Sequence, residues 1–260
     1  MKDYYILCRR KKCMKMGEKI KEKTKHITEV MEKALFTNVC PICNKVISSD
    51  EKICSHCIKK IKVIKEPKCK KCGSRLEDST KLFCNDCNEI CHEFEKGISI
   101  FEYNNEFKKS IYRFKYDNKR CYSDFYGSIG YRKYKETLEQ WKIDKIIPVP
   151  MYYKKQIMRG YNQAEEFGNA LSRYLGIKAD SDILLRVKNT KPQKGLNKEQ
   201  RKVNLAEAFA VNKEKIKNAE NILLVDDVYT TGSTMDTLAK LLKKAGAGKV
   251  YFMCIATGKR

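Results

Sequence analysis

Two sets of residues in this sequence have the types and spacing for chemistry: cysteines in the first third, and a run of carboxylate and hydroxyl side chains near the end. Each Cys-x-x-Cys pair lets one tight turn direct two thiolates at the same point, and two such turns complete the four-sulfur shell that structural zinc prefers. We therefore expect up to two structural Zn²⁺ ions, because four sulfurs leave no open position on the metal. The pairs are Cys40 with Cys43, Cys54 with Cys57, Cys69 with Cys72, and Cys84 with Cys87.

The spacing alone does not fix how the four pairs are grouped around two metals. We expect the first two pairs to share one site and the last two the other, while an interleaved grouping stays open. Gly73, directly after Cys72, supplies a residue that turns easily. A redox motif of thioredoxin type would need a βαβ context that is absent here. His56, Cys91 and His92 are spare ligands nearby, which we interpret as bystanders.

The run near the end of the chain lies between an apolar segment, 221–225, and a helical pattern that extends to Lys244. Its hydroxyls, its backbone N–H groups and the helix dipole would suit a phosphate monoester. Its two aspartates would repel that phosphate, but they suit sugar hydroxyls or Mg²⁺ bound through water. A phosphate beside a vicinal diol indicates a ribose 5-phosphate. The run consists of Asp226, Asp227, Val228, Tyr229, Thr230, Thr231, Gly232, Ser233 and Thr234.

The elements that must position this run indicate an α/β domain with a parallel sheet. Residues 145–149 form a short apolar strand, followed by a loop over 150–162 and by a helix with one apolar face. The segment 221–225 is apolar throughout, as in a central strand buried on both faces, and 249–256 is a further strand. Ligands bind beyond the carboxyl ends of such strands, where the run begins. The apolar face of the helix consists of Ala164, Phe167, Leu171 and Leu175.

Composition and charge exclude several classes of protein. The chain has 260 residues, of which 42% are hydrophobic, and this content argues against wholesale disorder. Its formal net charge of +23 favours anionic partners. No apolar run approaches the roughly 18 residues of a membrane-spanning helix. Basic residues recur through 1–33 without the apolar core of a signal peptide, so we expect a cytoplasmic location. The segment 186–202 is strongly basic and is either a solvated loop or an anion-binding one.

The distribution of the cysteines predicts a small module followed by a larger domain. We expect a basic N-terminal extension with helical spacing over 1–34, a cysteine-rich module over 35–92 and the α/β domain over 93–260. The extension could dock on the protein, fray in solution or touch a membrane surface as a peripheral association. Cys8 and Cys13 within it are interpreted as free thiols.

The segment 223–234 resembles the phosphoribosyl-pyrophosphate (PRPP) loop of type I phosphoribosyltransferases. Three further features narrow the resemblance to the ComF family of competence-associated proteins, with its ComFC-like and GntX-like members: the segment 101–116, the double zinc ribbon ahead of it, and the motifs of two loops. The resemblance covers about residues 35–260. The loop motifs are Arg159-Gly160-Tyr161-Asn162-Gln163, and Gln193 with Leu196, Arg201, Asn204, Leu205 and Phe209.

The resemblance implies a role for each part of the site. Asp226 and Asp227 would hold the ribose hydroxyls, and 230–234 would hold the 5-phosphate. The loop 150–163 would face the pyrophosphate, and the segment 190–204 would be the flexible loop that closes over PRPP. A hood that selects a base is expected from about 94–135. The residues implied for the two pyrophosphate loops are Arg159, Gly160, Asn162, Gln163, Gln193, Lys194, Arg201 and Asn204, with Arg159 and Arg201 as catalytic cations beside the aspartates.

Two functions are consistent with the sequence. The first is a PRPP- and Mg²⁺-binding protein linked to competence and DNA uptake, which transfers phosphoribosyl to an unidentified nitrogen acceptor. The second is a scaffold or sensor of the uptake machinery that binds single-stranded DNA, with a helicase-like ComFA partner implied by the resemblance. Base stacking would then involve exposed aromatic side chains. The candidates for stacking are Tyr103, Tyr112, Phe114, Tyr116 and Tyr122.

Overall fold

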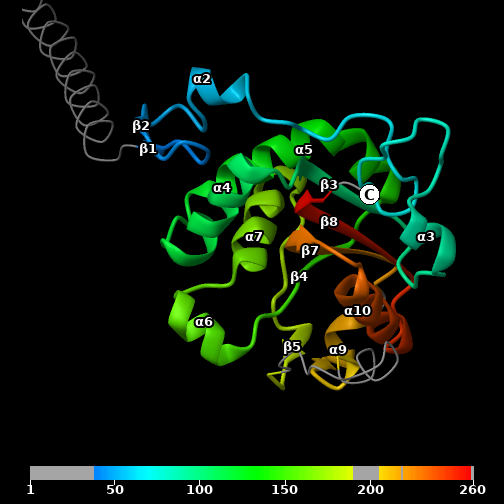
Figure 1. Cartoon of the computed structure of the whole chain (residues 1–260). Coiled ribbons are helices and arrows are strands. Elements are labelled where there is room, and N and C mark those ends of the chain that lie inside the picture. The colour runs from blue at the N-terminus through cyan, green and yellow to red at the C-terminus, as the bar shows by residue number, and fades with distance from the viewer. Residues whose placement is uncertain (1–37, 190–204, 218, 259–260) are drawn as a thin grey trace, which may run out of the picture.

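A four-stranded parallel sheet forms the centre of the described part of the chain (Figure 1). The computed structural model describes residues 38–189, 205–217 and 219–258. The strands lie in the order β3-β8-β7-β4 and run in the same direction, so their carboxyl ends meet at one edge. Their bounds are β3 (Gly97–Glu102), β4 (Lys145–Pro148), β7 (Asn221–Tyr229) and β8 (Lys249–Thr257).

The alternation of side chains along β7 divides the core into two layers. Ile222 and Leu224 point into a buried cluster with α10 (Ser233–Lys244), whereas Leu223 and Val225 point into a second cluster on the opposite face. All four side chains are fully buried, as a central parallel strand requires. The predicted α/β fold with helices on both faces of a parallel sheet is therefore confirmed. The second cluster is covered by α4 (Asn105–Tyr116), α5 (Tyr122–Trp141) and α7 (Gln163–Leu175).

Helix α7 follows the sequence pattern closely. Of its predicted apolar face, Ala164, Phe167 and Leu171 are buried, and Leu175 is partly buried against the same side of the core. The helix begins after Asn162, whose side-chain oxygen accepts the N–H of Ala164 at 3.1 Å, and it ends at Gly176 with a left-handed φ of 70°. The cap satisfies one of the N–H groups that a helix start leaves without a partner. These local signals explain why the helix after β4 is predictable.

Two features of the sheet differ from the sequence-based expectation. Strand β7 continues to Tyr229 instead of ending at Val225, because β8 runs beside it as far as Thr257 and supplies backbone partners. Asp226 and Asp227 are therefore strand residues. The stretch 94–135 begins with the edge strand β3, so a hood within it would have to be built from α4 and α5.

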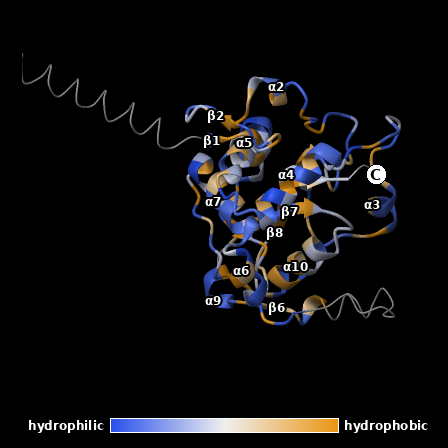
Figure 2. Ribbon diagram, turned by 60° about the vertical axis from the view of Figure 1, so that its left-hand side comes forward, coloured by the Kyte–Doolittle hydropathy of each residue, from blue (hydrophilic) through white to orange (hydrophobic). Residues whose placement is uncertain are grey.

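Shorter elements surround the sheet. Figure 2 shows hydrophobic colouring along β7 in the interior and mainly hydrophilic colouring on the peripheral α3. The predicted N-terminal helix and its two thiols lie outside the described residues. The shorter elements are β1 (Asn38–Val39), β2 (Val46–Ile47), α2 (Ser55–Ile58), α3 (Asn85–Glu89), α6 (Tyr153–Arg159), β5 (Leu184–Arg186), β6 (Phe209–Val211) and α9 (Lys213–Ile216).

Candidate functional site

The eight paired cysteines converge into two separate four-sulfur groups. The groups are Cys40/Cys43/Cys54/Cys57 and Cys69/Cys72/Cys84/Cys87, with all sulfurs of a group within 4.8 Å of one another. The sequential grouping is therefore confirmed. A tetrahedral zinc with Zn–S bonds of about 2.3 Å requires sulfurs about 3.8 Å apart. Cys43 and Cys54 have that spacing, 3.8 Å, as do Cys72 and Cys84, so both groups fit structural zinc ribbons.

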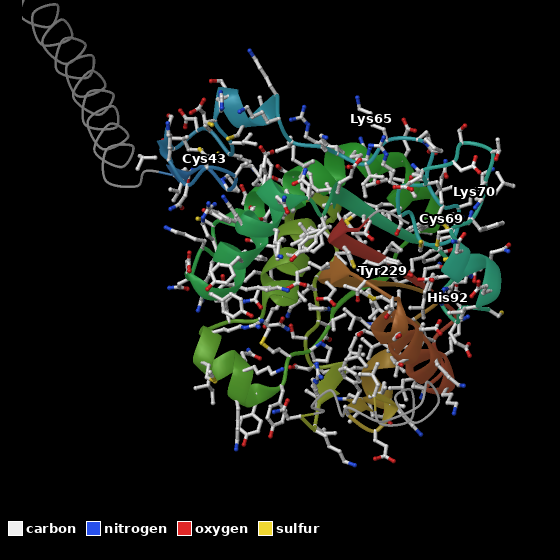
Figure 3. All side chains as sticks on the ribbon, viewed as in Figure 1. Cys43, Lys65, Cys69, Lys70, His92 and Tyr229 are labelled. Carbon is white, nitrogen blue, oxygen red and sulfur yellow. The ribbon has the colours of Figure 1, made fainter. Side chains whose placement is uncertain are left out.

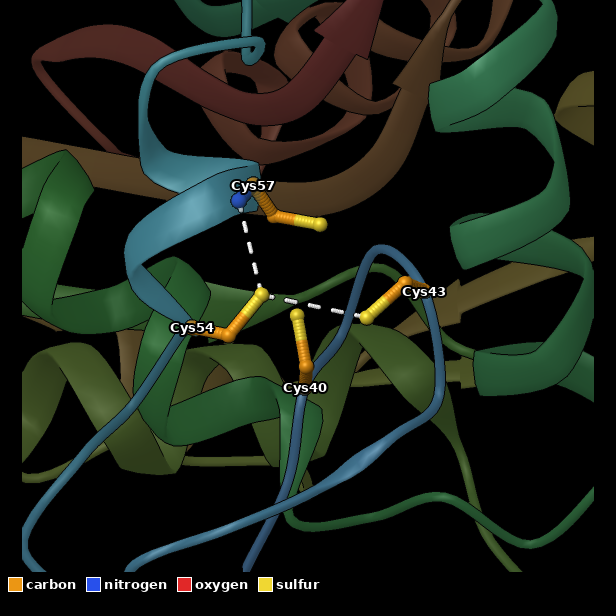
Figure 4. A group of neighbouring side chains, drawn as sticks. All are labelled: Cys40, Cys43, Cys54 and Cys57. Atoms are coloured by element: carbon orange, nitrogen blue, oxygen red, sulfur yellow. Dashed lines mark hydrogen bonds between the residues drawn. The ribbon is translucent and has the colours of Figure 1, made fainter.

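The side chains of the first group, which we call site 1, point toward one another (Figure 4). Cys40 and Cys43 come from the turn between β1 and β2, and Cys57 comes from α2, which begins after Cys54. The N–H of Cys57 points at the Cys54 sulfur at 3.4 Å, an arrangement that stabilises a thiolate. These four residues have only a small apolar cluster of their own, so a bound metal would add much of the local stability.

The second group, which we call site 2, is built into the core of the larger domain. Three of its cysteines belong to the same buried cluster as the α10 face of the sheet. Gly73 adopts a φ of 71°, and a Cβ there would lie 2.6 Å from the carbonyl oxygen of Gly97 in β3. The predicted need for glycine after Cys72 is therefore explained by both backbone conformation and close packing against the sheet.

The three spare ligands belong to neither group. His92 is buried, and its Nδ1 lies 3.2 Å from Oδ1 of Asp236 in α10. The same carboxylate oxygen accepts the N–H of Glu93 at 2.7 Å. His92 therefore fastens the chain after site 2 to α10.

The carboxylate and hydroxyl run lies at the carboxyl end of the central strand β7, as expected for a ligand site in a parallel sheet. Thr230, Thr231 and Ser233 are exposed, and the hydroxyls of the last two lie 2.9 Å apart. Gly232 has a φ of 79° and precedes α10, and no side chain caps this helix start. The N–H groups of the first helical turn therefore lie beside the hydroxyls and add positive potential.

The two aspartates lie among basic groups from distant parts of the chain. The Nζ of Lys115 in α4 lies 2.8 Å from Oδ2 of Asp227. Burial, together with the neighbouring charge of Asp227, raises the pKa of Asp226 to about 7, although Lys115 and Arg186 oppose this shift. Burial alone would lower the pKa of Lys115, but Asp227 and Asp226 together raise it. The site thus holds paired carboxylates whose full ionisation is unfavourable without a further ligand.

Arg186 of β5 is the second basic group near the aspartates. Burial lowers its pKa, and the charge of Asp226 partly offsets this effect. The sequence places Arg186 only at the start of a basic segment, and Lys115 only within a segment that carries the family resemblance. No local sequence pattern predicts that these two residues lie near the aspartates, because tertiary packing brings α4 and β5 to the site.

Arg159 lies at the end of α6, beside the same region. Its guanidinium donates to Gln163 Oε1 at 3.0 Å and to the Tyr116 hydroxyl at 3.1 Å, and it lies over the Tyr116 ring. Asn162 is buried; besides capping α7, it donates to the carbonyl of Val149 at 3.0 Å. Gly160 ends α6 with a φ of 79°. This loop is thus rigidly held, and its role toward pyrophosphate stays a prediction.

Four residues predicted for the flexible loop lie outside the described residues: Gln193, Lys194, Arg201 and Asn204.

The structure corrects part of the expectation for base stacking. Phe114 and Tyr122 are fully buried in the core and are not surface platforms. Tyr103, Tyr112 and Tyr116 are exposed. The correction follows from the helical period, since α4 turns Phe114 inward while Tyr112 and Tyr116 lie on its outer side.

Two protein-family models match separate segments of this chain. A double zinc ribbon domain model matches residues 31–88, and a phosphoribosyl transferase domain model matches residues 162–260. No helix in the described residues is long and apolar enough to cross a membrane.

Three curated relatives are similar to this chain. "Competence protein F" of Haemophilus influenzae is 37% identical over 209 residues, which cover 78% of this chain and 90% of the relative. "Competence protein ComFC" of Streptococcus pneumoniae is 30% identical over 78% of this chain and 86% of the relative. "DNA utilization protein YhgH" of Escherichia coli is 38% identical over 112 residues, which span 43% of this chain and 48% of that protein.

Proposed function

This chain belongs to the ComF family of competence-associated proteins, and from that premise we propose that it binds Mg²⁺-PRPP at the carboxyl end of β7 and acts in the uptake or use of DNA. The names of its relatives, competence protein F and DNA utilization protein, support the second part of the proposal. The phosphoribosyl transferase domain model over 162–260 supports the first.

One observation carries the proposal for PRPP. The exposed hydroxyls of Thr230, Thr231 and Ser233 lie directly after the paired carboxylates of Asp226 and Asp227, on one turn at the end of a buried strand. Hydroxyls and helix N–H groups suit the 5-phosphate, while carboxylates suit the ribose diol. A simple phosphate site would gain nothing from two carboxylates, so the ligand combines a phosphate with a polyol.

The proposed reaction is displacement of pyrophosphate by a nitrogen nucleophile. A bond forms between that nitrogen and C1 of the ribose, while the bond from C1 to the pyrophosphate oxygen breaks and its electron pair leaves with pyrophosphate. The nitrogen gives up the proton that it carried. Bound Mg²⁺ would neutralise charge on the leaving group. Arg159 and Arg201 are proposed to add positive charge there, and the carboxylates are proposed to hold the ribose in place.

Calorimetric titration of the zinc-loaded full chain with PRPP, with and without Mg²⁺, tests the binding step. We expect binding that requires Mg²⁺ and is lost when Asp226 and Asp227 are both replaced by asparagine. An Asp144→Asn variant is a matched control, because this carboxylate accepts the N–H groups of Glu220 and Asn221 at the opposite end of β7. Absence of PRPP binding by the parent protein would refute the proposal.

A panel of nitrogen acceptors tests the transfer step. Pyrophosphate release is measured with each base in the presence of Mg²⁺ and PRPP, and the double-asparagine variant is the control. Release with one acceptor in the parent only would establish transferase activity. Equal release by the variant would show that the chemistry takes place elsewhere.

A second candidate function, binding of single-stranded DNA without catalysis, is favoured by one surface feature. Tyr112 and Tyr116 are exposed on α4 with their rings 4.8 Å apart, and the guanidinium of Arg159 lies over the Tyr116 ring. Exposed rings next to cations suit base stacking and phosphate contacts.

Oligonucleotide binding tests this second function. Its affinity should fall steeply with salt, and replacing Tyr112 by alanine should weaken it by about 1–3 kcal/mol while phenylalanine retains it. An affinity that is insensitive to salt would exclude this kind of binding.

A further inference from the structure

Tyr229 lies between site 2 and the proposed phosphate loop. It is the last residue of β7, only 2% of its surface is exposed, and its ring stacks on Phe252 of β8 at 4.7 Å with an interplanar angle of 12°. Figure 3 labels Tyr229 at the end of β7, with Cys69 and His92 on the same side of the view. Because interiors are closely packed, the buried Tyr229 ring constrains the position of the residues that pack on it.

The phenol group of Tyr229 lies against the turn that would hold phosphate. A Cβ at Gly232 would lie 2.5 Å from the Tyr229 hydroxyl, so the backbone of Gly232 packs directly on that hydroxyl. The turn needs its glycine for this contact as well as for its positive φ of 79°. The position of the loop therefore depends on where the Tyr229 ring is held.

The cysteines of site 2 pack on the same ring cluster. Cys69, Cys72 and Cys84 belong to the buried core that contains Tyr229 and Phe252. Burial raises the pKa of Tyr229, and the nearby sulfurs of Cys72, Cys87 and Cys84 raise it further, which places them within electrostatic range of the phenol. Loss of the metal would remove the ion that joins four sulfurs from separate turns, and so would loosen the packing beneath the loop.

A second connection joins site 2 to the first turn of α10. After Cys87 the chain contacts α10 at two successive residues. The N–H of Glu93 donates to the Asp236 carboxylate at 2.7 Å, and Nδ1 of His92 lies 3.2 Å from the same carboxylate. Asp236 in turn donates its N–H to the carbonyl of Gly232 at 2.8 Å. Site 2 is thus connected to the phosphate loop in two ways, through Tyr229 and through Asp236.

Site 1 makes its contacts elsewhere. Arg113 of α4 donates to the carbonyl of Ile42 at 3.0 Å, and the Tyr122 hydroxyl of α5 donates to Asn44 at 2.8 Å. These contacts lie on the face of the sheet opposite α10. The two cysteine sites therefore have the same ligands but different neighbours: site 1 contacts α4 and α5, whereas site 2 packs beside α10.

We propose that metal-loaded site 2, acting through Tyr229 and Asp236, positions the phosphate loop, so that metal binding at site 2 and PRPP binding at the loop stabilise each other. The coupling rests on the proposed function, because it concerns the same PRPP site. Since coupling between two binding equilibria is reciprocal, PRPP must retain the metal of site 2 as strongly as that metal favours PRPP.

The reciprocal effect is measured on the unaltered, zinc-loaded full chain. Partition of zinc between the protein and a competing chromophoric chelator is measured at equilibrium, with and without saturating Mg²⁺-PRPP. We expect PRPP to tighten the binding of one of the two zinc ions about fivefold or more and to leave the other unchanged, a size ordinary for coupled sites. Equal zinc affinities with and without bound PRPP would overturn the coupling.

Matched variants assign the effect to a site. Cys87→Ser and Cys43→Ser each remove one partly buried ligand, from site 2 and site 1 respectively. We expect Cys87→Ser to weaken PRPP binding about tenfold or more. Cys43→Ser should weaken it several-fold less, because site 1 contacts α4, which carries Lys115, but not the phosphate loop. Tyr229→Leu leaves all eight cysteine ligands in place. It should also weaken PRPP binding, and its zinc content shows whether the effect arises without loss of metal.

Hydrogen exchange distinguishes failure of this inference from failure of the proposed function. In Cys87→Ser the amides of 230–236 should exchange faster while those of β4 keep their parent rates, whether or not PRPP binds. If the parent protein binds no PRPP, the proposed function fails. Hydrogen exchange at 230–236 then still tests whether site 2 positions the loop. Unchanged exchange at 230–236 in a variant that has lost one zinc would overturn the inference.

Discussion

Replacing Asp226 with asparagine should stabilise the ligand-free protein above neutral pH. Burial and the adjacent charge of Asp227 raise the pKa of Asp226 to about 7 in the folded protein, whereas a carboxyl in an unfolded chain has a pKa of about 3.9. Asparagine is nearly the same size and keeps the side-chain oxygen that accepts the N–H of Asp227 at 2.8 Å. The substitution therefore removes the charge but little else.

The sign and size follow from proton linkage. Between about pH 4 and pH 7 the native state binds more protons at Asp226 than the unfolded chain does, so stability from this group falls as pH rises through that window. A shift of about three pKa units sets a ceiling of about 4 kcal/mol. Since the side chain retains some solvent contact, we expect about 2 kcal/mol, or about 4–8 °C in Tm for a chain of this size.

The assay is thermal unfolding of parent and variant at pH 5 and pH 8, in Mg²⁺-free buffer without chelator so that zinc stays bound. The difference in Tm should be large at pH 8 and small near pH 5. An asparagine variant that is less stable than the parent at pH 8 would refute the electrostatic reasoning. Stabilisation accompanied by loss of PRPP binding is the pattern expected where stability is given up for function.

Three further predictions concern other parts of the molecule. Lys115→Met should lower stability by about 1–3 kcal/mol in urea unfolding, because it leaves Asp227 without its partner at 2.8 Å. Gly97→Ala should destabilise by about 3 kcal/mol or more, since the added Cβ would lie 2.0 Å from the Phe252 ring. Metal analysis should give two zinc ions per chain, and one after Cys57→Ser.

Each of these has a result that would contradict it. For the ion pair, the double variant with Asp227→Asn should recover most of the loss, and no recovery would argue against a direct interaction. An alanine at Gly97 that leaves urea unfolding unchanged would mean that the sheet does not pack as described. Zinc content well below two per chain would exclude two ribbons.

The phosphate site was only partly predictable. The run from Asp226 to Thr234 is local, and its chemistry follows from residue types on one strand, one turn and one helix start. Lys115 had no such signal, because a lysine on α4 has no sequence pattern that says which carboxylate it will meet. The extension of β7 as far as Tyr229 likewise depended on the length of its neighbour β8.

The sequence by itself determined the four Cys-x-x-Cys pairs, the strand and helix patterns of an α/β domain, and the run of carboxylates and hydroxyls at the end of β7, since each is a pattern within a few turns of chain. Tertiary structure alone decided that site 2 is part of the sheet core whereas site 1 lies on α4 and α5. The two sites have the same ligand pattern, and their difference arises from packing between segments far apart in the chain. The spacing of the cysteines determines that each group can bind zinc. Only the packing of the folded chain determines which helices and strands each site contacts.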